Sequence, residues 1–371
     1  MWRENRLIEL LDIEYPIIQA GMAGGPTTPE LVAAVSNSGG LGTLGAGYMA
    51  PEAVREAIHA IRKLTDRPFG VNLFIPEPID VDEAKIEQTN KRLDRYREEL
   101  GAQQERPEAV STEGPPFWEQ LNVLVEERVP VFSCTFGVPP AEAVERLRSA
   151  GVVVLGTATT VREGGELEAA GVDAVVAQGS EAGGHRGTFA GGAGAGDGSD
   201  GARFDAGMVG TMALVPQLAD KVSVPVVAAG GVMDGRGLAA ALALGAEGAQ
   251  MGTAFLTCEE SGAHEKHREA VIGSTDESTV VTRAFSGKPA RGIRNRMIDE
   301  LEPYADEFPD YPIHNSLTKG IRSAAKRQNK PEYMSLWAGQ AAGLSKRQSA
   351  AELVQDVVDE TEHILSNLAV R

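Results

Sequence analysis

Short apolar runs rich in Val, Ile and Ala alternate along the chain with longer amphipathic stretches. An apolar run of about four to eight residues is typical of a strand buried on both faces, and the stretches between the runs have the length and spacing of helices. This alternation predicts repeated βα units around a parallel sheet. The predicted strands are Tyr15–Gln19, Leu41–Gly45, Phe69–Phe74, Val129–Cys134, Val152–Gly156, Ala174–Gln178, Val224–Ala229 and Ala249–Gly252.

The stretches between the strands carry residue types that begin and end helices. Proline follows Thr28 and Ala50 at the start of two of them, where its missing N–H costs no hydrogen bond. Gly151 and Gly171 end two others, where a left-handed cap favours glycine. The predicted helices are Thr28–Ser38, Pro51–Thr65, Phe117–Glu127, Pro140–Ala150, Thr159–Ala170, Met208–Ala219 and Gly235–Leu244. Eight strands with these helices between them predict a (β/α)8 TIM barrel, with an open doubly wound sheet as the alternative.

Two segments interrupt the alternation. Asp80–Pro116 is long and charged, and we expect a helix over Ala84–Leu100 and an irregular chain over Gln103–Pro116. The pattern favours a solvated helical face, with a role in binding a partner as the alternative. Ala190–Gly201 consists largely of Gly, Ser and Asp and is expected to be a mobile loop.

The last third of the chain departs from the βα pattern. Glu260–Ile272 has the pattern of a helix, Thr275–Leu344 is rich in loop residues together with Pro, Arg and Tyr, and Ser349–Leu368 is again helical. We therefore divide the chain into a barrel over residues 1–274, a smaller loop-rich and helical region over 275–344 that covers the barrel mouth, and a C-terminal helix over 345–371 that packs back on the barrel.

Composition and charge exclude several classes of function. The 371 residues include 53 acidic and 35 basic side chains, a net charge of −18, which disfavours binding to nucleic acid or to an anionic membrane surface. No window approaches the roughly 18 consecutive apolar residues of a membrane-spanning helix, and residues 1–12 lack the apolar centre of a signal peptide. The two cysteines, Cys134 and Cys258, suit a reducing compartment, so we expect a cytoplasmic protein.

Glycine, at 43 residues, is concentrated where strands end. Gly21 follows the first predicted strand, Gly183 and Gly184 the sixth, and Gly230-Gly231 and Gly252 the seventh and eighth. Without a Cβ, such turns let backbone N–H groups approach an anion, and glycine turns after strands seven and eight commonly hold phosphate in a TIM barrel. A phosphorylated ligand or cofactor is therefore expected. Neither a G-x-G-x-x-G turn opening a helix nor a P-loop is present, which argues against a Rossmann NAD site and an ATPase.

His185 is the candidate general base, since it lies in the glycine-rich turn after the sixth strand and titrates near neutral pH. Cys134 ends the fourth strand and is interpreted as buried filler rather than a nucleophile. His264 and His267 are three residues apart without a third fixed ligand, so we predict no metal site. His314 is a candidate for lining the mouth. Lys319, Tyr304 and Tyr311 could also reach the site from the last third, although their spacing does not indicate it.

Polar side chains at three other strand ends could contact a planar heterocycle. Asn72 ends the third strand, Gln178 the sixth and Gln250 the eighth. Their amide groups can hydrogen-bond the polar edge of such a ring, although a strand-end turn is an alternative role for Asn72.

The combined motifs resemble the nitronate monooxygenase family, formerly the 2-nitropropane dioxygenases. The motifs are Pro16-Ile-Ile-Gln-Ala-Gly-Met22, Gly70-Val-Asn72, Gln178-Gly-Ser-Glu-Ala-Gly-Gly-His-Arg-Gly187, Ala228-Ala-Gly-Gly231 and Gln250-Met-Gly-Thr253, extended by Leu336-Trp-Ala-Gly-Gln340. The Glu-Ala-Gly-Gly-His element also occurs in flavin-dependent enoyl-acyl-carrier-protein reductases and related quinone reductases. The resemblance therefore leaves an NAD(P)H-dependent flavin reductase as the alternative.

The resemblance implies a barrel that binds FMN non-covalently and oxidises alkyl nitronates with O2 to a carbonyl compound and nitrite. By matching positions, Gly21 and Met22 would lie beside the isoalloxazine ring. His185 would lie over the ring, either as the base that removes a proton or as a group that positions an anionic substrate. Asn72, Gln178, Gly183 and Gly184 would surround the flavin and its ribityl chain, and Gly230, Gly231, Gln250, Met251, Gly252 and Thr253 would surround the phosphate. A homodimer is compatible with these features.

Overall fold

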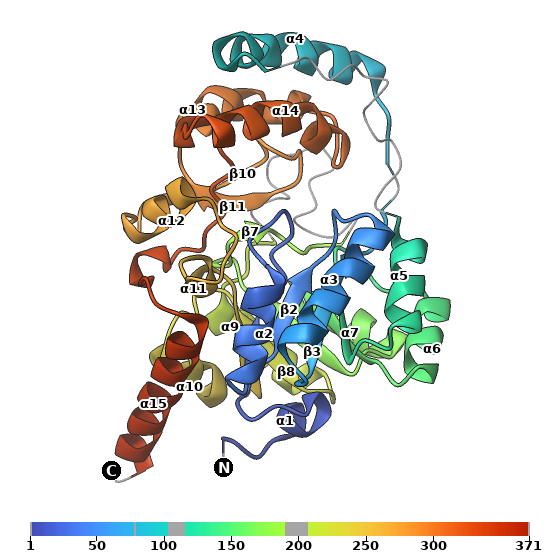
Figure 1. Cartoon of the computed structure of the whole chain (residues 1–371), viewed down its shortest axis with the longest axis vertical. Helices are drawn as coiled ribbons and strands as arrows, with labels where there is room; N and C mark the ends of the chain where they lie inside the picture. Colours follow the sequence, from blue (N-terminus) through green and yellow to red (C-terminus); the bar gives the residue numbers. More distant parts are fainter. Residues whose placement is uncertain (1, 78, 103–115, 190–206, 370–371) are drawn as a thin grey trace.

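A computed structural model describes residues 2–77, 79–102, 116–189 and 207–369 of the chain. Within these residues, eight parallel strands form one sheet in the order β1-β9-β8-β6-β5-β4-β3-β2 (Figure 1). A parallel bridge between Ile18 and Leu41 joins the first and last strands, so the sheet closes on itself. The predicted barrel is confirmed and the open doubly wound sheet is wrong. The strands are β1 (Ile17–Gln19), β2 (Gly42–Gly45), β3 (Phe69–Phe74), β4 (Val131–Thr135), β5 (Val153–Ala158), β6 (Ala174–Gln178), β8 (Val226–Ala229) and β9 (Gly248–Met251).

The helices between these strands agree with the predicted ones to within a few residues at either end. They are α2 (Pro29–Asn37), α3 (Pro51–Leu64), α5 (Phe117–Glu126), α6 (Ala141–Ser149), α7 (Val161–Ala170), α9 (Thr211–Lys221) and α10 (Gly235–Ala243). Local chemistry sets several of the starts, since the side chains of Thr28 and Asp234 accept hydrogen bonds from the first free N–H groups of α2 and α10. Thr160 and Glu163 form a complete capping box on α7.

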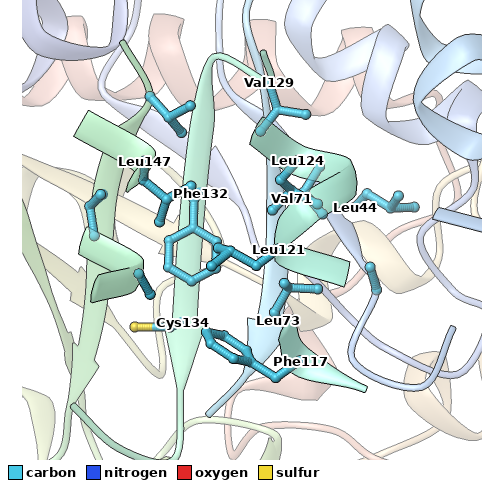
Figure 2. Close-up of a cluster of buried hydrophobic side chains, with 14 of the residues drawn as sticks. Leu44, Val71, Leu73, Phe117, Leu121, Leu124, Val129, Phe132, Cys134 and Leu147 are labelled. Carbon is cyan, nitrogen blue, oxygen red and sulfur yellow. The ribbon is translucent and has the colours of Figure 1, made fainter. Parts of the chain in front are cut away.

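The hydrophobic core lies between the strands and the surrounding helices. Phe117 and Leu121 of α5 face Phe132 of β4 and Leu73 of β3, with Cys134 beside them (Figure 2). Burial of each such large apolar side chain contributes about 1.5–3 kcal/mol to folding.

A second cluster fills the barrel interior toward the ends where the strands begin. Leu7 and Leu11 of α1 (Arg6–Leu11), a helix that the sequence pattern did not indicate, pack there against Ile18, Leu155 and Val227. Because α1 covers this end, the strand ends at the opposite side are the part of the barrel available for a site.

The segment over residues 275–344, which we predicted to be a loop-rich and helical region, also contains strands. It forms β10 (Thr279–Thr282), β11 (Ala290–Ile293), α13 (Arg296–Leu301) and α14 (Ile313–Arg327). Within the described residues, β11 pairs with β10 on one side and with β7 (Gly184–His185) on the other, forming an antiparallel sheet. The strands were missed because the partner β7 lies about 100 residues earlier. Figure 1 shows this segment over the strand ends of the barrel.

The charged insertion packs on that segment. Its helix α4 (Glu83–Leu100) lies at the far end of the molecule in Figure 1, beside α14. Leu93, Tyr96 and Leu100 are buried there, and the Tyr96 ring meets Tyr333 at 5.9 Å. Our interpretation of this helix as a solvated face is therefore wrong for one side of it. The predicted mobile loop Ala190–Gly201 and most of the irregular part of the insertion lie outside the described residues.

The remaining helices end the chain. α11 (Thr253–Leu256) follows β9 directly, and α15 (Ala350–Ala369) packs along α10. α12 (Glu265–Ile272) starts later than the predicted Glu260, because His264 acts as its N-cap and accepts from Lys266 N. None of the helices in the described chain has both the length and the apolar character needed to cross a bilayer.

Candidate active site

The residues predicted from the strand ends come together at one end of the barrel. Gly21 and Met22 follow β1, Gly183 and Gly184 follow β6, and Gly230-Gly231 follow β8. Asn72 and Gln178 lie at or near the ends of β3 and β6, Gln250 and Met251 end β9, and Gly252 and Thr253 lead into α11. Since the strands are parallel, their carboxyl ends form a single face, which is where TIM barrels carry their sites.

Close backbone approaches bring several of these positions together. A Cβ on Gly21 would lie 2.7 Å from Cβ of Asn72, so the chain after β1 lies directly against β3. A Cβ on Gly183 would lie 2.5 Å from the carbonyl carbon of Ala338, and Thr253 Oγ1 accepts a hydrogen bond from Gly339 N at 3.0 Å. The segment Leu336–Gln340 therefore packs directly against Gly183 and Thr253 on one side of the site.

The turn after β8 has a backbone conformation that favours glycine. Gly230 and Gly231 have φ values of +108° and +75°, which side chains other than glycine rarely adopt. The nearby N-terminus of α9 is already satisfied, because the Glu181 carboxylate accepts hydrogen bonds from Thr211 N and Oγ1. Backbone groups of Gly230, Gly231, Gly252 and Thr253 thus remain the candidates for holding a phosphate.

His185 is partly buried among aromatic rings from distant segments. Its ring lies 5.5 Å from Trp337 and 5.9 Å from both Phe136 and Tyr311, measured between centroids. Its Nε2 atom lies 2.8 Å from Oγ of Ser286. Burial lowers the pKa of His185 from 6.5 to about 3, and the positive charges of Lys288 and Arg322 act in the same direction. The imidazole is therefore neutral near pH 7, with one N–H and one nitrogen lone pair.

The backbone around His185 is held by two neighbouring side chains. Gln178 donates from Nε2 to the carbonyl of His185 at 3.1 Å and accepts from Gly187 N at 2.7 Å. The buried Arg186 donates to carbonyl oxygens of Gln178, Thr159 and Gly207 at 2.6–3.1 Å. Gln178, predicted to contact a heterocycle, thus uses its carboxamide to fix the turn that carries His185.

Charged groups face His185 from the segment above it. Lys288 forms an ion pair with Glu77 at 2.6 Å, and its Nζ lies 4.5 Å from the centroid of Phe136. Both partners of the ion pair are largely buried. The surroundings of His185 are consequently aromatic, with the Lys288–Glu77 ion pair and Arg322 close enough to act on the ring.

The other predicted site residues, Asn72, Gln250 and Met251, differ in burial and in the hydrogen bonds that they form. Asn72 donates to Ser133 Oγ at 2.9 Å and is buried. Gln250 is half-buried, whereas the side chain of Met251 packs in the core between β9 and the helices. Met251 therefore meets the site through its backbone, whose carbonyl accepts from Ala20 N.

Several weaker candidates lie elsewhere. Cys134 is buried in the core, and burial raises the pKa of its thiol to about 12, so it is no nucleophile. His267 bonds the Trp337 carbonyl at 2.9 Å, and no cluster of metal-ligating side chains occurs within the described ranges. His314 is fully buried: its ring stacks on Phe308 with a centroid distance of 4.2 Å, and its Nε2 lies 2.9 Å from the Ala284 carbonyl oxygen. Lys319 and Tyr304 are exposed, and the Arg92 guanidinium lies over the Tyr304 ring. Of the three candidates from the last third of the chain, Tyr311 contacts His185.

Sequence reasoning missed Ser286, Lys288, Phe136 and Glu77. One partial signal is present: the β-type run Thr279–Thr282 comes shortly before the turn residues Ser286–Pro289. The following Ala290–Ile293 is Ala-Arg-Gly-Ile and lacks β-type composition, so the local sequence indicates a turn but neither the second strand nor the part of the barrel that it meets.

Comparison with known proteins agrees with this geometry. The family model described as nitronate monooxygenase matches residues 4–360. The chain belongs to the nitronate monooxygenase family, whose members are oxidoreductases. A probable nitronate monooxygenase of Staphylococcus aureus strain Newman is 47% identical over 365 residues, which cover 98% of this chain and 99% of the relative.

Two solved structures are also similar over nearly the whole chain. Nitroalkane oxidase from Streptomyces ansochromogenes is 40% identical with a TM-score of 0.89, covering 98% of this chain and all of its own. FabK from Thermotoga maritima is 32% identical with a TM-score of 0.76, covering 99% and 98% of the two chains. Both alignments include the barrel together with the segment above it.

Proposed function

We propose that this protein binds FMN non-covalently and uses it to oxidise alkyl nitronates, and neutral nitroalkanes after removal of a proton. The observation that carries the proposal is the position of His185, a neutral imidazole beside the glycine-lined strand ends and enclosed by aromatic rings. Membership of the nitronate monooxygenase family and the similarity to a nitroalkane oxidase support it.

The residues present fit a flavin mononucleotide. Gly230 and Gly231 have no Cβ and adopt positive φ values, and a Cβ on Gly184 would have no neighbour within 4 Å, so the backbone at Gly184 is open to a ligand. We assign the phosphate to the Gly230-Gly231 turn and the flat ring to the backbone near Gly184 and Gly21. In this assignment Gly252 and Thr253 complete the phosphate contacts, and Asn72 with the Gly21-Met22 backbone flanks the ring.

His185 acts on the proton at the carbon that bears the nitro group. In a neutral nitroalkane this C–H bond breaks, the proton passes to the imidazole, and the electron pair is delocalised into the nitro group as the nitronate anion. Lys288 and Arg322 favour that developing negative charge, and the anion in turn raises the proton affinity of His185. A preformed nitronate has already lost this proton and requires only binding and orientation.

When bound, FMN would supply the electron transfer from the nitronate to O2, with a carbonyl compound and nitrite as products. The protein contributes orientation and exclusion of water through Phe136, Tyr311 and Trp337, whose rings surround His185.

The second candidate is an NAD(P)H-dependent flavin reductase of an enoyl thioester or a quinone. The specific observation in its favour is the similarity to FabK along 99% of this chain. The two functions differ in the electron donor that reduces the flavin.

Anaerobic mixing of the flavin-loaded protein with propionate 3-nitronate or with NADH separates them. We expect the nitronate to bleach the flavin absorbance and NADH to leave it unchanged. Prompt bleaching by NADH without a response to the nitronate would exclude the monooxygenase function.

A further inference from the structure

Ser286 occupies a position in which each of its hydrogen-bonding sites is used. It lies in the turn between β10 and β11 and is 1% exposed. Its Oγ donates to the carbonyl oxygen of Lys288 at 3.0 Å and accepts from the backbone N–H of Lys288 at 3.3 Å. The third contact of Oγ is Nε2 of His185 at 2.8 Å.

Counting hydrogens assigns the direction of that third contact. A serine hydroxyl has one hydrogen and two acceptor positions. The hydrogen points to the Lys288 carbonyl and one acceptor position takes the Lys288 N–H, so the remaining position must accept a hydrogen from Nε2. We propose that Ser286 is a positioning residue that fixes His185 as the Nε2–H tautomer and leaves Nδ1 as the nitrogen that receives the substrate proton.

The surroundings of His185 support a fixed orientation of the ring. β7 pairs with β11 so that His185 lies opposite Ala290, which places the Ser286 turn beside the imidazole. Gln178 binds the His185 carbonyl from the barrel side. No described residue forms a hydrogen bond with Nδ1.

The same hydrogen bond serves both protonation states of the ring. When Nδ1 gains a proton from the carbon of a nitroalkane, Nε2 keeps its hydrogen and continues to donate to Ser286. The charged and titratable groups facing the ring are Lys288 from the turn, with its partner Glu77, Arg322 from α14, and Tyr311 just before α14. This reaction step rests on the proposed function, whereas the tautomer does not.

The tautomer is measured directly by 15N NMR of the histidine rings, with the His185 signals identified by their loss in His185→Asn. At pH 7 we expect a protonated Nε2 and an unprotonated Nδ1 in the wild-type protein, and a mixture of tautomers in Ser286→Ala. A wild-type ring protonated at Nδ1, or unchanged in Ser286→Ala, overturns the proposal. This readout requires no turnover, so it is independent of the proposed function.

Kinetics test the consequence for the reaction. In Ser286→Ala, kcat/KM for neutral nitroethane should fall roughly 10- to 100-fold, the effect of losing a hydrogen bond to a charged group, while ethyl nitronate turnover stays near that of the wild type. Equal losses on both substrates, or none on nitroethane, contradict the proposal. Ser36→Ala is the matched control, because Ser36 is equally buried and also accepts from a backbone N–H, but lies on α2. It should leave both rates unchanged.

Discussion

His185 lies directly opposite Ala290 in an antiparallel ladder. The candidate base therefore belongs to two parts of the molecule, since its turn leaves the barrel after β6 and then becomes an edge of the sheet formed by residues 279–293. The chemistry of the site depends on the barrel and on the segment above it together.

The role of His185 as the base predicts a difference between two substrates. In His185→Asn, turnover of neutral nitroalkanes should fall by about two or more orders of magnitude, because the variant has no group that accepts the proton. Turnover of a preformed nitronate should fall less. Steady-state rates with nitroethane and its nitronate, compared at equal flavin content, provide the measurement. Full nitroalkane activity in the variant would remove His185 as the base.

The contact between Gly183 and Ala338 predicts a loss of both stability and cofactor binding. The side chain of Gly183→Val would meet the Ala338-Gly339 backbone at about 2.5 Å, so Leu336–Gln340 must move. Overpacking of this kind costs about 1–3 kcal/mol of unfolding free energy. Urea denaturation and titration with FMN should show a lower midpoint and weaker binding.

Gly165→Ala in α7 is the control for this change. Its added Cβ would lie 3.7 Å from the Lys221 side chain, an ordinary contact, and alanine is favoured in helices by about 1 kcal/mol. We expect an unchanged or raised midpoint. Equal behaviour of the two variants would show that the Gly183 contact is unimportant.

Buried neutral histidines predict a loss of stability in mild acid. Burial lowers the pKa of His314 from 6.5 to about 4, and of His267 likewise to about 4. Between these values and 6.5 the unfolded chain binds more protons than the folded protein, so stability is complete above pH 6.5 and decreases as the pH falls. Each such histidine should lower the free energy of unfolding by about 2 kcal/mol between pH 7 and pH 5.

Denaturation with urea at pH 7 and pH 5 measures this effect. His314→Gln should lose less stability between the two pH values than the wild type, whereas substitution of the exposed His363 should not change the difference. An identical pH dependence in wild type and His314→Gln would contradict the assignment.

The two thiols should be unreactive in the folded protein. Cys134 and Cys258 are buried, and burial raises the pKa of each thiol to about 12, which suppresses the thiolate that reacts with alkylating agents. Iodoacetamide at pH 8 should modify neither residue until urea unfolds the chain, as followed by mass spectrometry. Rapid labelling of Cys134 with loss of activity would contradict this prediction and make Cys134 a candidate nucleophile.

The sequence by itself determined the barrel and most of the strand-end residues. Every predicted barrel strand occurs, because a strand buried on both faces must be continuously apolar and its turns need glycine or capping residues nearby. Both signals are local in the chain. The glycines and His185 could be located for the same reason, since parallel strands bring all their carboxyl ends to one face.

Only the tertiary structure decided what surrounds His185. The strands β10 and β11 are short and lack a repeating pattern, and their ladder is completed by β7, about 100 residues earlier. Ser286, Lys288 and Trp337 reach the imidazole through that pairing. The apolar side of α4 packs on α14, which is likewise far away in the sequence. Contacts between segments so far apart depend on how the whole chain packs, and no local spacing of residues encodes them.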